Sequence, residues 1–186
     1  MMWLPWETAV DLNRHADRVA RRRCGVVEAA DGRFVRLVLR PWPKWVSRPA
    51  VLLMGAVRRR RAGDRCRLYY HQPWGHPRYL VVSYVVSAAG TSLATFYRTL
   101  DVIDHVARLK GSDAILCDAA NERLTLRIMA RRGWEPHCPS PWHRHFIKRF
   151  YGDYPSPPAW LARPSSAMTA TPPDECPSCD WDRRLV

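Results

Sequence analysis

Two histidines in the last third of the sequence have the type and spacing for acid–base chemistry. His143 and His145 occur in "HCPSPWHRH", residues 137–145, and their alternate positions place both side chains on one face of a strand. Imidazole titrates near neutral pH, so either ring can act as a general base toward an amine. A basic strand at the protein surface is the simpler interpretation, and the residues alone favour it.

The same stretch contains His137 and Cys138, which raises the question of a zinc site. Thiolate and imidazole are common zinc ligands, and "CPSC" near the C-terminus adds Cys176 and Cys179. A structural zinc site usually has two ligand pairs at recognisable spacing, whereas this CPSC is isolated in a segment rich in proline and serine. We therefore expect no metal site.

The chain is strongly basic. Thirty Lys and Arg against 17 Asp and Glu give a formal charge of +13. Such a charge favours polyanions, namely nucleic acid, phosphorylated cofactors or acidic proteins. A surface solvated by arginine explains the same charge without any partner. The apolar runs are too short to cross a bilayer, so no membrane partner is expected.

The beginning of the chain and its cysteines indicate a cellular compartment. The first 15 residues show no basic start, no apolar block and no small-residue cleavage site, so secretion is not indicated. Six cysteines are scattered through a core-forming sequence, which favours reduced thiols over a disulfide framework. These features predict a cytoplasmic protein.

Hydrophobic periodicity predicts an N-terminal helix followed by a hairpin. Residues 7–23 gather their apolar side chains on one helical face, and Gly25 follows as a stop. Residues 26–41 show the pattern of a hairpin with Asp31-Gly32 at its turn.

Further strands are expected up to residue 88. Residues 51–73 form a second candidate hairpin, which turns around residues 62–64. Residues 79–87, "YLVVSYVVS", are apolar on both faces in their middle. This strand should lie centrally in a sheet.

The period changes after residue 91. The elements expected from there are a helix over 93–110 stopped by Gly111, a strand over 113–119, a helix over 122–132 stopped by Gly133, and a last strand within 142–152. The second of these helices should turn Leu124, Ile128 and Met129 inward.

This order predicts an α/β (α+β) fold with a mixed, mostly antiparallel sheet. A strand–helix–strand step implies one parallel pair, residues 79–87 with 113–119, joined by the crossover helix 93–110. The folded domain should cover residues 1–154. Residues 155–186 are rich in Pro and Ser and are expected to form a flexible tail that contributes little to the core.

Over roughly residues 78–150 the sequence resembles the GNAT superfamily of acyl-CoA-dependent N-acyltransferases. The resemblance rests on the order of elements, on "CDAAN" ending at Asn121, and on the Gly133-Trp134 pair after the next helix. It implies a GNAT-like sheet and an acyl-CoA, such as acetyl-CoA, as cosubstrate. The N-terminal part departs from the family, which begins with a strand and a helix pair.

The resemblance also implies a coenzyme A site. In the family a loop Gln/Arg-x-x-Gly-x-Gly/Ala holds the pyrophosphate on backbone N–H groups at a helix start. The matching stretch is "AAGTSLATF", with Ala89 in place of Gln or Arg and Ser92 in place of the first glycine. The implied contacts are Val86, Ser87, Gly90, Thr91, Ser92, Leu93, Ala94, Thr95 and Asn121. A Ser/Thr-capped helix, and an Asx turn at Asn121, are the alternative interpretations.

The implied activity is transfer of an acyl group from acyl-CoA to an amine of an unknown acceptor. Backbone N–H groups around Val86 and Ser87 would polarise the thioester carbonyl. The base would be one of four side chains: Tyr84, Asp118, His143 or His145. The family often places a tyrosine on the second helix to protonate the thiolate, and this helix has none.

Two other functions remain open from the sequence. One is a GNAT-like binding or scaffold domain without catalysis, which the altered loop and the missing tyrosine favour. The other is a basic nucleic-acid-binding protein, which the charge favours.

Overall fold

A computed structural model describes residues 6–42, 63–119, 125–138 and 144–162. Within these ranges the strands are β1 (Glu7–Ala9), β2 (Cys24–Ala30), β3 (Arg33–Arg40), β4 (Arg65–His71), β5 (Tyr79–Ser87), β6 (Ala114–Ala119), β7 (Glu135–Pro136) and β8 (Arg144–Arg149). The helices described are α1 (Ala16–Arg21), α3 (Leu93–Lys110), α4 (Leu126–Ala130) and α5 (Ala159–Ala162).

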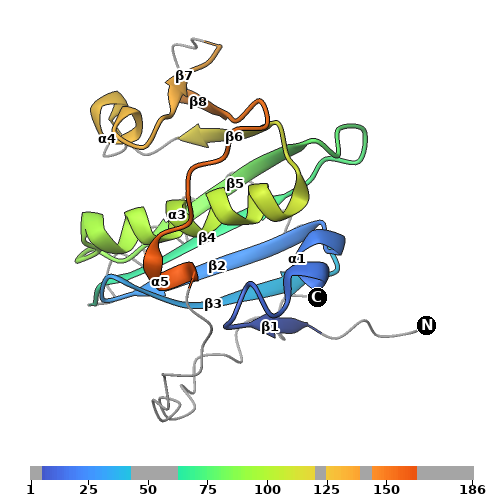
Figure 1. The fold of residues 1–186 in the computed structure, drawn as a ribbon. Coiled ribbons are helices and arrows are strands. Elements are labelled where there is room, and N and C mark those ends of the chain that lie inside the picture. The colour runs from blue at the N-terminus through green and yellow to red at the C-terminus, as the bar shows by residue number, and fades with distance from the viewer. Residues whose placement is uncertain (1–5, 43–62, 120–124, 139–143, 163–186) are drawn as a thin grey trace.

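The described strands form one mixed sheet in the order β1-β3-β2-β4-β5-β6-β8-β7. All neighbouring pairs in it are antiparallel except β5 and β6, which are parallel. The helix α3 leads from β5 to β6 and lies across one face of the sheet (Figure 1). The predicted mixed sheet, its parallel pair and its crossover helix are confirmed.

Local sequence explains why α3 has these limits. Ser92 caps the helix by accepting a hydrogen bond from the Thr95 amide, and Gly111 ends it with a left-handed φ of 62°. The side chains of Phe96, Leu100 and Ile103 recur at helical spacing and are buried against the sheet. Leu93 lies in the first turn of the helix and is exposed.

The predicted N-terminal helix over residues 7–23 is wrong in its first half. Residues 7–9 form β1, which pairs with β3, and only Ala16–Arg21 are helical. The Asp11 carboxylate accepts hydrogen bonds from the amides of Asn13 and Arg14, and this turn competes with a helix.

The first hairpin is confirmed, with Asp31 and Gly32 both at positive φ, 49° and 71°. In the second predicted hairpin, β4 takes β2 and β5 as its neighbours, while residues 51–62 lie outside the described residues.

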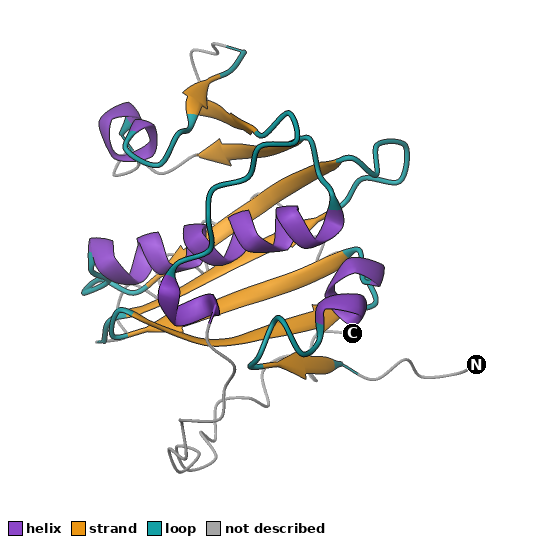
Figure 2. Cartoon of the chain, in the orientation of Figure 1, coloured by secondary structure: helices purple, strands orange, loops and turns teal. Residues whose placement is uncertain are grey.

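The helix predicted over residues 122–132 is shorter in the structure. Thr125 caps α4 at its Ile128 amide, and the helix ends at Ala130. The Met129 side chain is buried and Ile128 packs against the core, as predicted, while Leu124 lies outside the described residues. Together with β7 and β8, α4 lies beyond β6 at the end of the sheet opposite to β1 (Figure 2).

Part of the predicted tail belongs to the folded domain. Leu161 of α5 is buried in the core, and Trp160 packs against Phe34 of β3. The side-chain amide of Asn13 donates to the Leu161 carbonyl at 2.8 Å, and Asn13 Oδ1 lies 3.1 Å from His105 Nε2 on α3. The domain boundary predicted at residue 154 is therefore corrected to at least residue 162, and residues 163–186 lie outside the described residues.

No described helix has the length and apolar character needed to cross a membrane.

Candidate functional site

The parallel strands β5 and β6 stay paired over only part of their length. Their register runs from Tyr79↔Ala114 to Val82↔Cys117, whereas β5 continues to Ser87. At the same point β5 carries an extra residue, because Tyr69 of β4 pairs with Tyr84 while the next residue of β4 pairs with Val82. A bulge of this kind increases local twist and bends the strand. The second half of β5 thus parts from β6.

The direction of the β5 amides beyond the bulge follows from its pairing with β4. The Ala88 amide donates to the Arg65 carbonyl, so Ala88 points its main-chain groups toward β4. Directions alternate along a strand. Val86 therefore points toward β4 as well, whereas Val85 and Ser87 direct N–H and C=O toward the side of β6. Of the two residues predicted to polarise a carbonyl, Ser87 directs its N–H away from β4, whereas Val86 directs its N–H toward β4.

Two of the four predicted base candidates lie opposite each other just past the last β5–β6 pair. Asp118 of β6 faces His145 of β8 in the antiparallel register, with Asp118 Oδ1 4.0 Å from His145 Nδ1. Both side chains are partly exposed to solvent. This separation is longer than a hydrogen bond. A closer approach of the carboxylate to Nδ1 would favour the tautomer in which Nε2 can accept a proton.

The other two candidates are placed differently. The Tyr84 ring stacks on Tyr69 across β4 and β5, with ring centroids 4.2 Å apart. His143 and the predicted cofactor contact Asn121 lie outside the described residues.

The start of α3, predicted to hold pyrophosphate, is occupied by a carboxylate of the protein itself. Asp64, just before β4, accepts the Ser92 amide at 2.8 Å and the Ser92 hydroxyl at 2.6 Å. Burial raises the pKa of the Asp64 carboxyl, but hydrogen bonds from Ser92 and Thr95 outweigh it and hold the pKa below its ordinary value. An anion is favoured at this position by the helix dipole.

Neighbouring turns fix the remaining groups of the loop. The Thr91 hydroxyl donates to the Arg65 carbonyl at 2.7 Å, and the Thr95 hydroxyl accepts the Gly32 amide at 2.7 Å. Gly90 lies against Gly63. The amides of Leu93 and Ala94 belong to the first helical turn and have no partner among the described residues. They are the part of the predicted cradle that remains open to an anion.

Sequence reasoning missed Asp64, which stands 28 residues before Ser92. The signal was present as "GD" in front of a strand, but nothing local joins it to the helix start.

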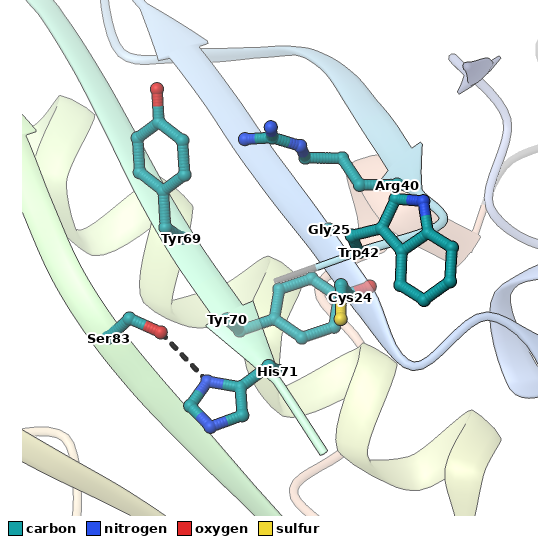
Figure 3. Close-up of a pocket in the computed structure, with 8 residues that line it drawn as sticks. All are labelled: Cys24, Gly25, Arg40, Trp42, Tyr69, Tyr70, His71 and Ser83. Atoms are coloured by element: carbon teal, nitrogen blue, oxygen red, sulfur yellow. Dashed lines mark hydrogen bonds between the residues drawn. The ribbon is translucent and has the colours of Figure 1, made fainter. Parts of the chain in front are cut away.

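A small pocket apart from these residues lies on β2, β3, β4 and β5 (Figure 3), and no sequence motif predicted it. In it His71 Nδ1 and Ser83 Oγ are hydrogen-bonded at 2.8 Å, and burial lowers the pKa of His71. The Tyr70 ring lies over Gly25, where any Cβ would come within 2.7 Å of the phenol oxygen. Arg40 and Trp42 complete its wall.

The described cysteines Cys24, Cys66, Cys117 and Cys138 are free thiols. Within the described part of the chain no three His, Cys, Asp or Glu side chains gather as a metal site.

No protein-family model matches the sequence, and no curated protein matches it either. Among solved structures with a detectable likeness is nourseothricin acetyltransferase. It is 11% identical, with 78% of this chain and 97% of the other chain covered and a TM-score of 0.34. A likeness this weak assigns neither a family nor an activity to the chain.

Proposed function

We propose that the chain is a GNAT-like N-acyltransferase that binds an acyl-CoA between β5 and β6 and transfers the acyl group to an amine. One observation carries the proposal: the parallel strands part after Val82 and Cys117, and Asp118 with His145 lies directly beyond. The parting leaves main-chain groups of β5 for a ligand, and the adjacent couple supplies a base.

In this proposal the main chain of β5 binds the cosubstrate. Val85 and Ser87 offer N–H and C=O groups to the amides of an extended pantetheine arm, as a further strand would. An N–H from the same pair polarises the thioester carbonyl as the amine attacks it. The amides of Leu93 and Ala94 take one phosphate.

His145 serves as the base, and Asp118 positions its ring. The attacking amine gives its proton to Nε2 of His145 as the C–N bond forms, and the C–S bond then breaks with coenzyme A leaving as the thiolate. Tyr84 and His143 remain alternative bases in the proposal. The acceptor is an amine.

A catalytically inactive scaffold is the second candidate, and Asp64 favours it. Its carboxylate already satisfies the Ser92 amide and hydroxyl, and it would repel a pyrophosphate at the same helix start. The helix α4 also has no tyrosine to protonate a thiolate.

Calorimetric titration with acetyl-CoA tests the proposal. We expect weak binding, in the range of about 0.1–1 mM, which Ala94→Asp abolishes by placing a negative charge at the exposed start of α3. The control is Ala16→Asp, the same change at the start of α1. If acetyl-CoA binds neither the wild type nor Asp64→Asn, the transferase proposal is refuted and the inactive scaffold replaces it.

Transfer itself is tested by supplying acetyl-CoA and a set of primary amines and following thiol release. His145→Gln should lower the rate at saturating acetyl-CoA by about 10²-fold or more and leave the calorimetric affinity unchanged. An equal rate in this variant would remove His145 as the base.

A further inference from the structure

Large aromatic side chains are exposed at the end of the sheet opposite to the start of α3. Trp6, Trp42, Trp74 and Tyr79 have exposed fractions of 46%, 70%, 78% and 38%. They lie at the ends of four strands: before β1, after β3, after β4 and at the start of β5. The strand β2 lies between β3 and β4 in the sheet. Tryptophan is mostly buried in folded proteins, so a group of exposed rings marks an interaction surface.

Two arginines stack on two of these rings. The Arg23 guanidinium lies 4.2 Å from the centre of the Trp74 ring, and that of Arg40 lies 4.5 Å from the Trp6 ring. Arg40 also has two buried guanidinium nitrogens, Nε and Nη1, without a hydrogen-bond partner among the described residues. A buried donor left without an acceptor is costly, and an anion would satisfy it.

The helix α1 lies at this end of the sheet (Figure 1), and the arginines on and beside it add positive charge there. Arg14, Arg18 and Arg21 line an open hollow beside α1 and form no salt bridge within the described chain. The Arg22 guanidinium in the same hollow pairs with Glu7. The unpaired arginines fit a ligand with several negative charges.

We propose that this end of the sheet binds single-stranded nucleic acid. Bases would stack on the free faces of the tryptophans, while Arg23, Arg40 and the α1 arginines contact phosphates. Neighbouring strands of a sheet are about 4.8 Å apart, and β2 lies between β3 and β4. The surface from β3 to β5 therefore spans about 14 Å and accommodates several nucleotides.

Single strands fit this surface better than a duplex or an acidic peptide does. Bases in a duplex are stacked on each other and cannot cover exposed rings, and α1, with six residues, is short for a groove-reading helix. An acidic peptide would use the arginines and leave the rings uncovered. This surface lies at the other end of β5 from the proposed acyl-CoA site, so the two proposals stand or fall separately.

Fluorescence anisotropy of the full chain with a labelled 20-residue oligouridine or oligothymidine at 50 mM salt tests the proposal. We expect binding with quenched tryptophan emission, and a loss of about 5- to 150-fold in affinity for Trp74→Ala. Trp74→Phe should retain most of the affinity, because it keeps a ring for stacking.

A matched pair of charge variants tests the phosphate contacts. Arg23→Ala should reduce the slope of log affinity against log salt by about 0.7, the contribution of one phosphate on a single strand. Arg33→Ala removes an exposed arginine at the opposite end of the sheet and should leave the slope unchanged.

Three results would overturn the proposal. They are no binding of single strands at 50 mM salt, equal affinity for a duplex or for polyglutamate, and full affinity in Trp74→Ala.

Discussion

Replacing Asp64 tests whether an internal carboxylate holds the start of α3. Asp64→Ala removes two hydrogen bonds to Ser92, of 2.8 and 2.6 Å, and leaves the helix dipole without its anion. Hydrogen bonds to charged groups contribute about 1.5–3 kcal/mol each. Asp64 and Ser92 are only half-buried, so in the variant water can form hydrogen bonds with Ser92 and recover part of this free energy. A net loss of about 1–2 kcal/mol, the scale of a helix cap, follows.

Thermal unfolding measures this loss. A domain of this size loses about 2–4 °C of Tm per kcal/mol, so Asp64→Ala should unfold roughly 2–8 °C lower than the wild type at pH 7. The control is Asp17→Ala in the first turn of α1, where the carboxylate caps nothing; this change should stay within about 0.5 kcal/mol.

The effect should also depend on pH with a defined sign. The folded pKa of Asp64 lies below its ordinary value of 3.8, so its stabilisation is present above that value and is lost as pH falls through the folded pKa. The difference between wild type and Asp64→Ala should therefore shrink below about pH 4. Equal stability of the two proteins at pH 7, or a difference that grows on acidification, refutes the role given to Asp64.

The same residue should oppose coenzyme A. A phosphate on the Leu93 and Ala94 amides would lie about 5 Å from the carboxylate, where two unit charges repel by about 1 kcal/mol in water and about 3 kcal/mol at an effective dielectric constant of 20. Asp64→Asn keeps a hydrogen-bond acceptor and removes the charge. Acetyl-CoA should bind it roughly 5- to 150-fold more tightly than the wild type, and unchanged affinity would show that the two anions do not compete.

Four further changes address the packing of the fold. Gly25→Ala should cost about 1–3 kcal/mol in urea unfolding, because its Cβ would meet the Tyr70 phenol at 2.7 Å. Lys148→Met should cost about 3–5 kcal/mol in the same assay, since it leaves the buried Asp104 carboxylate without its partner at 2.6 Å; a loss below 1 kcal/mol would contradict this. Burial raises the pKa of Asp104 from 3.8 to about 6, so wild-type stability should fall relative to Asp104→Asn as pH rises from about 4 to 6, measured by urea unfolding at each pH. Removing residues 159–186 should lower the Tm by several degrees because Leu161 leaves the core, and an unchanged Tm would restore the predicted tail.

The parts of the fold that were predictable have local signals. A serine cap, a helical apolar face and a terminal glycine are all contained within 20 residues at α3, and the apolar run of β5 identified a central strand. The strand–helix–strand order then left the parallel pair as the expected arrangement.

The errors occurred where distant segments decide the structure. Residues 7–9 are a strand because β3 is there to pair with them, and Leu161 is buried because Asn13 and Phe34 lie beside α5. Neither contact can be predicted from helical periodicity or from proline content, because both join segments distant in the sequence.

The candidate site shows the same division. Asp118 and His145 were both nominated by residue type, but only the β6–β8 register brings them to opposite positions. Asp64 was missed because its partner Ser92 is 28 residues later in the sequence, after both β4 and β5.

The hydrogen bond from Asn13 to Leu161 joins two segments that are synthesised at very different times. Its partners are 148 positions apart, so at about 5–20 residues per second roughly 7–30 s separate their appearance during translation. During that interval the β1–α1 region lacks its contact with α5. The last described helix to be synthesised thus completes the packing around the segment that leads into α1. In a chain stalled before residue 161, the surface around Phe34 that α5 covers would therefore be exposed to chaperones and proteases.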